Sequence, residues 1–187
     1  MPDEQLLLKT FSNNDFTYID VLISRYEDSL FNLCLKLAKS RMDAEELYQQ
    51  TWLKAIQKSN TCSKSIKNWL YTICINTYRD SFRRSKRENA VIDNTLKEEA
   101  KIYVIEAATN NVSAETEALK NITSTVLMHK ISMLPDKHRL PVIMYYFEGF
   151  DYKETAAVLG LPIGTVKSRL NSAKEKLRKE MENEIDV

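Results

Sequence analysis

The chain has 187 residues, with 27 Lys and Arg against 26 Asp and Glu, and a formal net charge of +1. That balance excludes a globally basic protein, so any surface for nucleic acid must come from local clustering of charge. Only 3 Gly and 4 Pro leave few turn formers between long helix-compatible runs. We therefore expect an all-α protein built as one domain or two small ones.

The sequence shows no targeting or membrane-spanning segment. No stretch approaches the roughly 20 apolar residues that a transmembrane helix needs, and the first residues do not resemble a signal peptide. Three cysteines, Cys34, Cys62 and Cys74, form no C-x-x-C pair. This predicts a reduced cytoplasmic protein without disulfides or structural zinc. We expect Cys34 and Cys74 to lie in the core.

The N-terminal part predicts three helices. Apolar residues at steps of three and four mark the first helix: Phe16, Ile19, Ile23, Tyr26, Leu30, Leu33 and Leu37. Asp43, with Glu46 three residues later, predicts a capping box at the start of the second helix. A polar loop over 59–63 precedes a third helix over 65–84. The residues that the third helix is expected to bury are Ile66, Trp69 or Leu70, Ile73, Thr77 and Phe82.

We expect these helices to form a domain over residues 1–88, followed by a flexible linker over 89–113, where the apolar pattern weakens. A second helical domain is expected over 114–187. Its first helix would run toward Leu134 and bury Leu119, Ile122, Val126 and Leu127. A turn at Pro135–Asp136 then leads to a helix through 142–147, which begins or kinks at Pro141 because proline lacks the backbone N–H.

Residues 151–178 predict two short amphipathic helices around a Gly-Leu-Pro turn. Asp151 caps the first helix, and Glu154 completes a capping box. Gly160 ends that helix, and Pro162 prevents its continuation. The expected buried stripe of the first helix is Tyr152, Ala156 and Leu159. The second helix places on one narrow face the residues Val166, Leu170, Ala173 and Leu177.

The opposite face of the second helix is polar and cationic. It carries Ser168, Asn171, Ser172 and Glu175, flanked by Lys167, Lys174 and Arg178. A helix of this kind suits the DNA major groove, so we interpret the pair as a helix-turn-helix. An αα-hairpin within a helical bundle is the structural alternative. Basic residues also cluster over 65–88 and 164–181, apart from acidic ones, which indicates two kinds of partner.

The C-terminal part contains three motifs that together resemble the C-terminal domain of small bacterial RNA polymerase sigma factors of the extracytoplasmic-function (ECF) group. They are L-P-x-x-x-R at 134–139, Y-x-E-x-A-x-x-L-G at 152–160 and G-T-V-K-S-R-L at 164–170. Residues 43–55 resemble the helix by which these factors bind the polymerase clamp. Residues 68–84 resemble their promoter-melting helix.

The resemblance implies a non-catalytic specificity subunit of RNA polymerase, with no metal or cofactor. Its N-terminal domain would recognise and open the minus-ten promoter element, and its C-terminal domain would read the minus-thirty-five element. The implied minus-thirty-five contacts are Thr165, Lys167, Ser168, Arg169, Asn171, Ser172 and Lys174. Free N–H groups at Gly164 and Thr165 would receive a phosphate.

Several of these roles have alternatives. Lys167 and Lys174 suit either guanine edges or phosphates, and Arg169 suits either DNA or an ion pair with Glu154. Many relatives carry larger or basic residues at the positions of Asn171 and Ser172, which leaves the minus-thirty-five sequence open.

Promoter melting needs aromatic faces and cations for unpaired bases. The implied minus-ten and melting residues are Lys67, Trp69, Tyr71, Asn76, Tyr78, Arg79, Arg83 and Arg84. Asn76 lies near the family's site for a flipped base, where its amide would read a base edge; the alternative is a hydrogen bond to its own helix. Trp69 is expected in the core, and the loop over 59–65 is a second candidate for base reading.

The second helix implies a docking surface for the polymerase clamp. Its implied residues are Glu45, Glu46, Leu47, Gln49, Gln50, Trp52 and Leu53. Burial of Trp52 in the core is the alternative for that residue. The implied partners are core RNA polymerase, promoter DNA and an anti-sigma protein, which in this family is often anchored in a membrane.

Two other classes of protein share part of this pattern. A stand-alone helix-turn-helix regulator would share the C-terminal part but would not need the clamp-type and melting-type helices. An enzyme has little support, because the sequence has no Gly-rich phosphate loop, and His129 and His138 have no evident nucleophile or metal partner.

Overall fold

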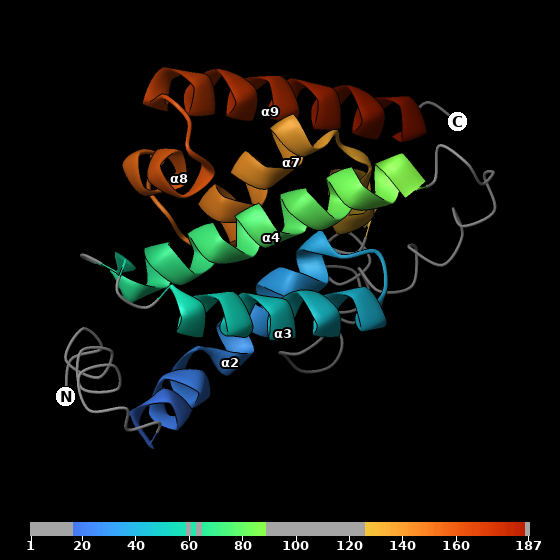
Figure 1. Ribbon diagram of the computed structural model, residues 1–187. Helices are drawn as coiled ribbons and strands as arrows, with labels where there is room; N and C mark the ends of the chain where they lie inside the picture. The colour runs from blue at the N-terminus through green and yellow to red at the C-terminus, as the bar shows by residue number, and fades with distance from the viewer. Residues whose placement is uncertain (1–16, 59–60, 63–64, 89–125, 186–187) are drawn as a thin grey trace, which may run out of the picture. The chain divides into compact units, whose positions relative to one another are not determined.

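The computed structural model describes residues 17–58, 61–62, 65–88 and 126–185, and the regular elements in these ranges are all helical (Figure 1). This confirms the all-α expectation for the described part of the chain. The chain divides into an N-terminal unit, Met1–Thr95, and a C-terminal unit, Leu96–Val187. The predicted linker over 89–113 lies outside the described residues, as do Phe16, Leu119 and Ile122. No described helix is both long and apolar enough to cross a membrane.

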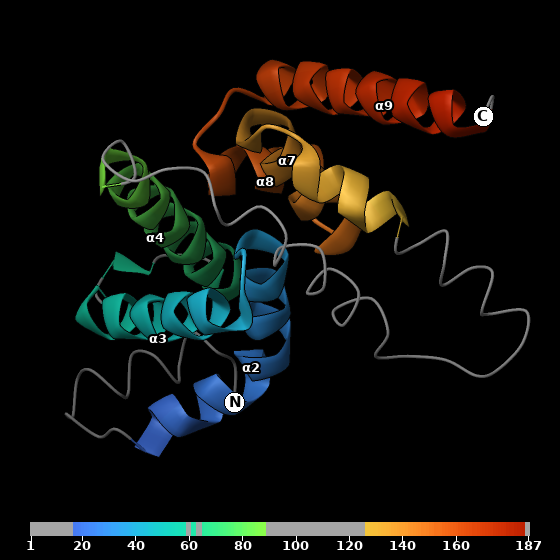
Figure 2. The same ribbon diagram turned by 90° about the vertical axis from the view of Figure 1, so that its right-hand side faces the viewer.

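The described residues of the N-terminal unit form the helices α2 (Thr17–Leu37), α3 (Arg41–Gln57) and α4 (Ile66–Glu88). Both α2 and α4 pack against α3 (Figure 2). The predicted stripe of α2 is confirmed at its buried positions Ile19, Leu30, Leu33 and Leu37, while Ile23 and Tyr26 are half-buried.

The expected cap of α3 is wrong. The helix begins at Arg41, and the Ser40 hydroxyl accepts a hydrogen bond from the Asp43 N–H at 3.1 Å. Ser40 is extended, as an N-cap requires, whereas Asp43 already lies in the first turn. There its negative charge suits the helix dipole without capping the helix.

The third predicted helix, α4, buries more residues than the spacing of its apolar residues predicted. Ile66, Ile73 and Thr77 are buried as expected, and Leu70 rather than Trp69 fills the core position. The side chain of Phe82 lies outside the described residues. Cys34 and Cys74 are confirmed as buried residues, and their thiols lie 3.8 Å apart between α2 and α4. Cys62 is half-buried.

In the C-terminal unit, the described residues form a helix over 126–133, followed by three α-helices and a π-helical turn after the first of these three. They are α7 (Asp136–Val142), η2 (Ile143–Phe147), α8 (Tyr152–Leu159) and α9 (Ile163–Ile185). Within this unit α9 lies along α7 and α8 (Figure 1).

Two expectations for the start of this unit need correction. In the helix over 126–133, Met128 and Ile131 are buried and Leu127 packs against the core as expected, whereas Val126 is 38% exposed, so the expectation is wrong at Val126. Pro141 does not begin a helix, because α7 already starts at Asp136. Instead the backbone widens into the π-helical turn η2 directly afterwards, with the Glu148 N–H donating to the Ile143 carbonyl at 3.1 Å.

The helix-turn-helix is formed by α8 and α9, and both predicted caps are confirmed. The Asp151 carboxylate accepts from the Glu154 N–H at 2.8 Å, and the Glu154 carboxylate accepts from the Asp151 N–H at 3.0 Å. Gly160 ends α8 in the left-handed conformation, with φ at 65°. Val166, Leu170 and Ala173 are buried against the rest of the unit.

The expected inward face of α8 is only partly right. Ala156 and Leu159 are buried, but Tyr152 is 37% exposed. Thr155 and Val158 fill the core instead.

Replacing Gly160 by Ala tests the left-handed helix end. A side chain at this φ costs about 1–2 kcal/mol, so we expect the C-terminal unit to lose that much stability in urea unfolding followed by far-UV circular dichroism. Gly164→Ala is the matched control, because Gly164 lacks a positive φ and a Cβ there meets open space. Trp52 and Trp69 report on the N-terminal unit, whose fluorescence transition stays in place. Equal stability of the two Ala variants would contradict the prediction.

Candidate nucleic-acid interface

Five of the seven residues predicted to contact the minus-thirty-five element lie on the solvent face of α9, and the other two lie at its edge. Lys167, Ser168, Asn171, Ser172 and Lys174 are exposed, and Thr165 and Arg169 are half-buried. The short side chains in the middle of this face leave the helix backbone accessible, with a lysine on either side of them along the helix. A DNA groove can therefore approach closely between the two cations.

The start of α9 differs from expectation in one respect. The Thr165 N–H donates to the Pro162 carbonyl at 2.9 Å, so it is not free for a phosphate. The N–H groups of Ile163 and Gly164 come earlier in the helix and have no backbone acceptor among the described residues. These two groups, rather than that of Thr165, are placed to receive an anion.

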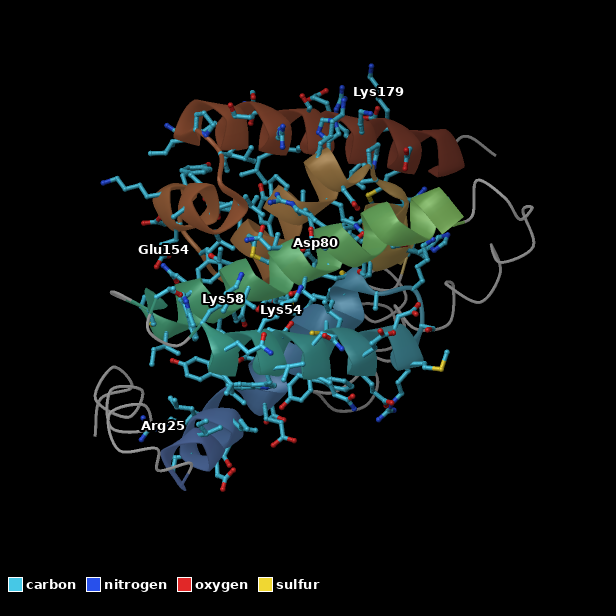
Figure 3. The ribbon with its side chains drawn as sticks, viewed as in Figure 1. Arg25, Lys54, Lys58, Asp80, Glu154 and Lys179 are labelled. Atoms are coloured by element: carbon cyan, nitrogen blue, oxygen red, sulfur yellow. The ribbon has the colours of Figure 1, made fainter. Side chains whose placement is uncertain are left out.

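Arg169 makes no ion pair with Glu154 in the described structure. The Glu154 carboxylate is used by the capping box of α8, where Figure 3 labels it. The Arg169 carbonyl lies 3.3 Å from Nδ1 of the buried His138, which ties α7 to α9. The Arg169 side chain therefore remains a candidate for DNA contact.

Farther along α9, the cations are of two kinds. Arg178 bridges Glu175 at 3.2 Å and Glu182 at 2.9 Å. The hydrogen bond to Glu175, followed by the charge of Glu182, raises the pKa of the Arg178 guanidinium. Lys174 and Lys179, the latter labelled in Figure 3, are exposed and form no ion pair with the residues that the structure describes. Arg178 is thus partly neutralised, whereas these lysines keep their charge for a partner.

An aromatic cluster beside the start of α9 was missed by the sequence reasoning. The rings of Tyr145 and Tyr152 are stacked, with centroids 4.7 Å apart and planes at 14°. Tyr146 meets Tyr145 edge-on at 4.9 Å. The ammonium of Lys167 lies 5.4 Å from the centre of the Tyr152 ring. In the sequence, the aromatic run Tyr145-Tyr146-Phe147 indicates such a cluster. The direction in which these side chains point, however, depends on the π-helical turn η2, which the sequence pattern did not predict.

On α4, the more accessible side chains follow one helical stripe. Trp69 and Thr72 are half-buried, and Asn76 and Asp80 are exposed. The Asn76 amide makes no hydrogen bond with the described residues, so the alternative of a bond to its own helix is not seen. The Trp69 indole N–H donates to the Thr61 hydroxyl at 3.1 Å, and its ring packs partly against Leu22 and Ile66.

Two of the predicted melting residues need correction. Tyr71 is fully buried, with its hydroxyl donating to the Ser29 carbonyl at 3.3 Å, and Tyr78 is also buried. Neither ring offers a face on which an unpaired base can stack. The Lys67 ammonium lies 5.6 Å from the centre of the Tyr71 ring, and Arg79 is half-buried. The side chains of Arg83 and Arg84 lie outside the described residues.

The predicted clamp surface on α3 is mostly exposed. Glu45, Glu46, Gln49, Gln50 and Leu53 face solvent, and Leu53 is 49% exposed. Leu47 belongs to the core and must be removed from this surface. Trp52 is half-buried, packed against the pair Leu22–Ile66 and edge-on to Tyr48 at 6.4 Å. Core burial of Trp52 is thus only partial, since one side of its ring is covered, and its contact with polymerase stays a prediction.

Beside this surface, the Lys54 ammonium of α3 lies 3.9 Å from the Asp80 carboxylate of α4; Figure 3 labels both residues. Lys54 is partly and Asp80 largely exposed, so the ion pair contributes little to stability. Lys54 nevertheless offsets the negative charge of Asp80 within the exposed stripe of α4. Within the described residues, no group of three or more His, Cys, Asp or Glu side chains could hold a metal ion.

Fold and site together define a helix-turn-helix protein of the transcription apparatus. Residues 22–88 match the protein family described as Sigma-70 region 2, and residues 124–177 match Sigma-70, region 4. The chain belongs to the sigma-70 family of RNA polymerase sigma factors, in the ECF group. It is a non-catalytic subunit that directs promoter-specific initiation of transcription, which rules out the stand-alone regulator and the enzyme.

The similarity to curated relatives extends over most of the chain. The ECF sigma factor SigW of Bacillus subtilis is 25% identical over 162 residues, which cover 86% of this chain and 87% of SigW. The sigma-H factor of Pseudomonas aeruginosa is 25% identical over 182 residues, which cover 96% of this chain and 94% of the relative.

Two solved structures share the fold. The sigma factor RpoE of Bartonella quintana, in complex with the anti-sigma factor NepR, has a TM-score of 0.67 at 23% identity, covering 88% of this chain and 96% of RpoE. CnrH, in complex with the cytosolic domain of CnrY, has a TM-score of 0.66 at 18% identity, covering 97% of each chain.

Shortening Leu53 tests the surface of α3. An exposed Leu that becomes buried on binding contributes enough for Leu53→Ala to weaken the affinity for core RNA polymerase about ten-fold. The measurement is a fluorescence-anisotropy titration of the labelled protein. Met42→Ala is the matched control, since Met42 is 76% exposed in the first turn of the same helix and outside the predicted surface. Equal affinities for the wild type and Leu53→Ala would remove Leu53 from the docking surface.

Proposed function

We propose that the N-terminal domain, residues 1–88, recognises and opens the minus-ten element, and that the C-terminal domain, residues 114–187, reads the minus-thirty-five element through α9. The observation that carries this proposal is the division of α9 into a buried apolar stripe and an exposed face of small polar and cationic side chains. A helix anchored in this way presents a fixed set of contacts to the major groove.

The minus-thirty-five contacts follow from that face. Lys167 and Lys174 lie seven residues apart, which is about two helical turns, and so bracket the polar residues between them. Ser168 and Asn171 offer donors and acceptors to base edges. The Ser168 hydroxyl already donates to the Thr165 carbonyl at 3.0 Å, so it contacts DNA as an acceptor unless it rotates.

The minus-ten contacts centre on the exposed stripe of α4. Asn76 is its best-placed member, because a solvent-facing amide without a partner in the described structure can both donate to and accept from an extruded base. Trp69, two turns before Asn76, and Arg79, one turn after it, lie on the same side of the helix. We keep Lys67, Arg83 and Arg84 as proposed contacts to the DNA backbone.

The proposed polymerase contact is the exposed part of α3. Leu53 and the uncovered side of Trp52 provide apolar area, and Glu45, Glu46, Gln49 and Gln50 form its rim. An apolar centre with a polar rim is the arrangement found in stable protein interfaces. The acidic members favour a basic partner surface.

We also propose that an anti-sigma protein regulates this chain in the cytoplasm, where RNA polymerase acts. Both solved relatives described above carry partner proteins, named as the anti-sigma factor NepR and the cytosolic domain of CnrY. The exposed surfaces of α3 and α9 are the ones that such an inhibitor must cover to prevent transcription.

The proposal is tested by transcription in vitro, with core polymerase and a pool of genomic fragments, in the presence and absence of the protein. New start sites that share two upstream elements would support it and would identify the promoter. DNA binding without core polymerase, together with no new start sites, would overturn it.

On the promoter found in this way, Asn76→Ala is expected to remove discrimination at one minus-ten position. The wild type should favour one base there by about ten-fold, and the variant should accept all four nearly equally. Start frequencies are measured on four templates that differ only at that base. Ser81→Ala, at another exposed position of α4, keeps the preference. Unchanged base preference in Asn76→Ala would exclude the amide as the reader.

Lys167→Gln is expected to weaken promoter binding by the holoenzyme and to change its dependence on salt. If Lys167 contacts a phosphate, the slope of log K against log salt falls by about 0.9; if it reads a guanine edge, preference at one minus-thirty-five position relaxes instead. Lys179→Gln, on the same helix but outside the predicted contacts, is the control. Lys167 is not a DNA contact if neither quantity changes.

A further inference from the structure

We propose that Tyr152, stacked on Tyr145, is a positioning residue that holds the ammonium of Lys167 in place on the DNA-reading face of α9. This inference rests on the proposed function, because it concerns how a side chain that reads DNA is arranged before DNA arrives. It adds one residue from α8 and one from η2 to the machinery of the recognition helix.

The cluster joins three elements of the C-terminal unit. Tyr145 belongs to η2, Tyr152 to the first turn of α8, and Lys167 to the second turn of α9. The two rings are nearly parallel and 4.7 Å apart, and the Lys167 ammonium lies 5.4 Å from the Tyr152 centroid. This is within the range of a cation–π interaction.

Tyr145 connects the stack to the core. It is half-buried and packs against the hydrophobic cluster that contains Val166 and Leu170. The neighbouring Tyr152 phenol raises the pKa of the Tyr145 phenol. Tyr152 is held along one ring face by Tyr145, although it is 37% exposed.

Restriction of Lys167 matters because a lysine side chain has many rotamers. A residue that loses this freedom only on binding weakens the complex, whereas one already ordered in the free protein does not. Lys174, two turns later on the same face, has no aromatic partner among the described residues. The two lysines thus differ in preorganisation while sharing a helix, and Lys174 is an internal control.

The first experiment uses the free full-length chain with ¹³C-labelled lysine. A cation over an aromatic face has its ε-CH₂ protons shifted upfield by the ring current. We expect such shifts for Lys167 and also for Lys67, which lies over the Tyr71 ring, and the Lys167 signal is assigned by its loss in Lys167→Arg. The Lys167 shift should persist in Tyr152→Phe, which keeps the ring, and disappear in Tyr152→Leu, which keeps apolar bulk only. A Lys167 shift that survives in Tyr152→Leu, or is absent from the wild type, would overturn the contact.

The second experiment measures binding of the reconstituted holoenzyme to the promoter found above. Tyr152→Leu should weaken binding by about two- to five-fold, and Tyr152→Phe should restore it. In a double-mutant cycle, Tyr152→Leu should cost nothing further once Lys167 is Ala, but should keep its full effect when Lys174 is Ala. Circular dichroism and the unfolding midpoint check that each variant folds.

Independent losses in Tyr152→Leu and Lys167→Ala would overturn the positioning role, since Tyr152 would then act on DNA or on stability by itself. The outcomes also separate this inference from the proposed function. An upfield Lys167 signal in a protein that directs no initiation would overturn the proposed function and any DNA-reading role of the cluster. A missing signal in an active sigma factor would overturn the inference alone.

Discussion

The arrangement of the C-terminal unit depends on the burial of one apolar stripe. Val166, Leu170 and Ala173 of α9 pack against the helix over 126–133 and against α7 and α8. Once this stripe is buried, the rotation of α9 about its axis is fixed, and the residues about 180° away must face solvent. The polar and cationic face is therefore a consequence of packing, and no separate interaction is needed to expose it.

Local signals predicted much of this unit because they act within a few residues. The capping box at Asp151 and the left-handed end at Gly160 each depend on a short stretch of sequence, and the structure has both. The motif L-P-x-x-x-R also has a local explanation: Arg139 donates to the Asp136 carboxylate at 2.9 Å within the first turns of α7. Its arginine supports the fold and is largely buried.

Predictions failed where a side chain depends on distant packing. Tyr71 and Tyr78 are predicted as DNA contacts because aromatic and basic residues alternate along α4, but both rings are buried, and the Tyr71 hydroxyl reaches the Ser29 carbonyl of α2. Leu47 of α3 is buried as well. Tyr152, in contrast, was predicted to be buried but is exposed and stacks on Tyr145. Tyr145 lies in the π-helical turn η2, which the sequence pattern did not predict. The spacing of apolar residues indicates a helix with one buried face, but it does not indicate how many neighbouring elements pack around that helix.

Because of the π-helical turn η2, the direction of the side chains in this unit depends on the number of residues in the turn rather than on their type. A π-helical turn accommodates one residue more than the α-helical hydrogen-bonding pattern would. Each residue turns an α-helix by about 100°, so the extra residue changes the direction in which the following side chains point. Deleting a single residue from Ile143–Phe147 would restore a regular helix while turning the aromatic side chains away from α8. The number of residues in this segment, as much as its tyrosines, therefore determines whether the aromatic cluster forms.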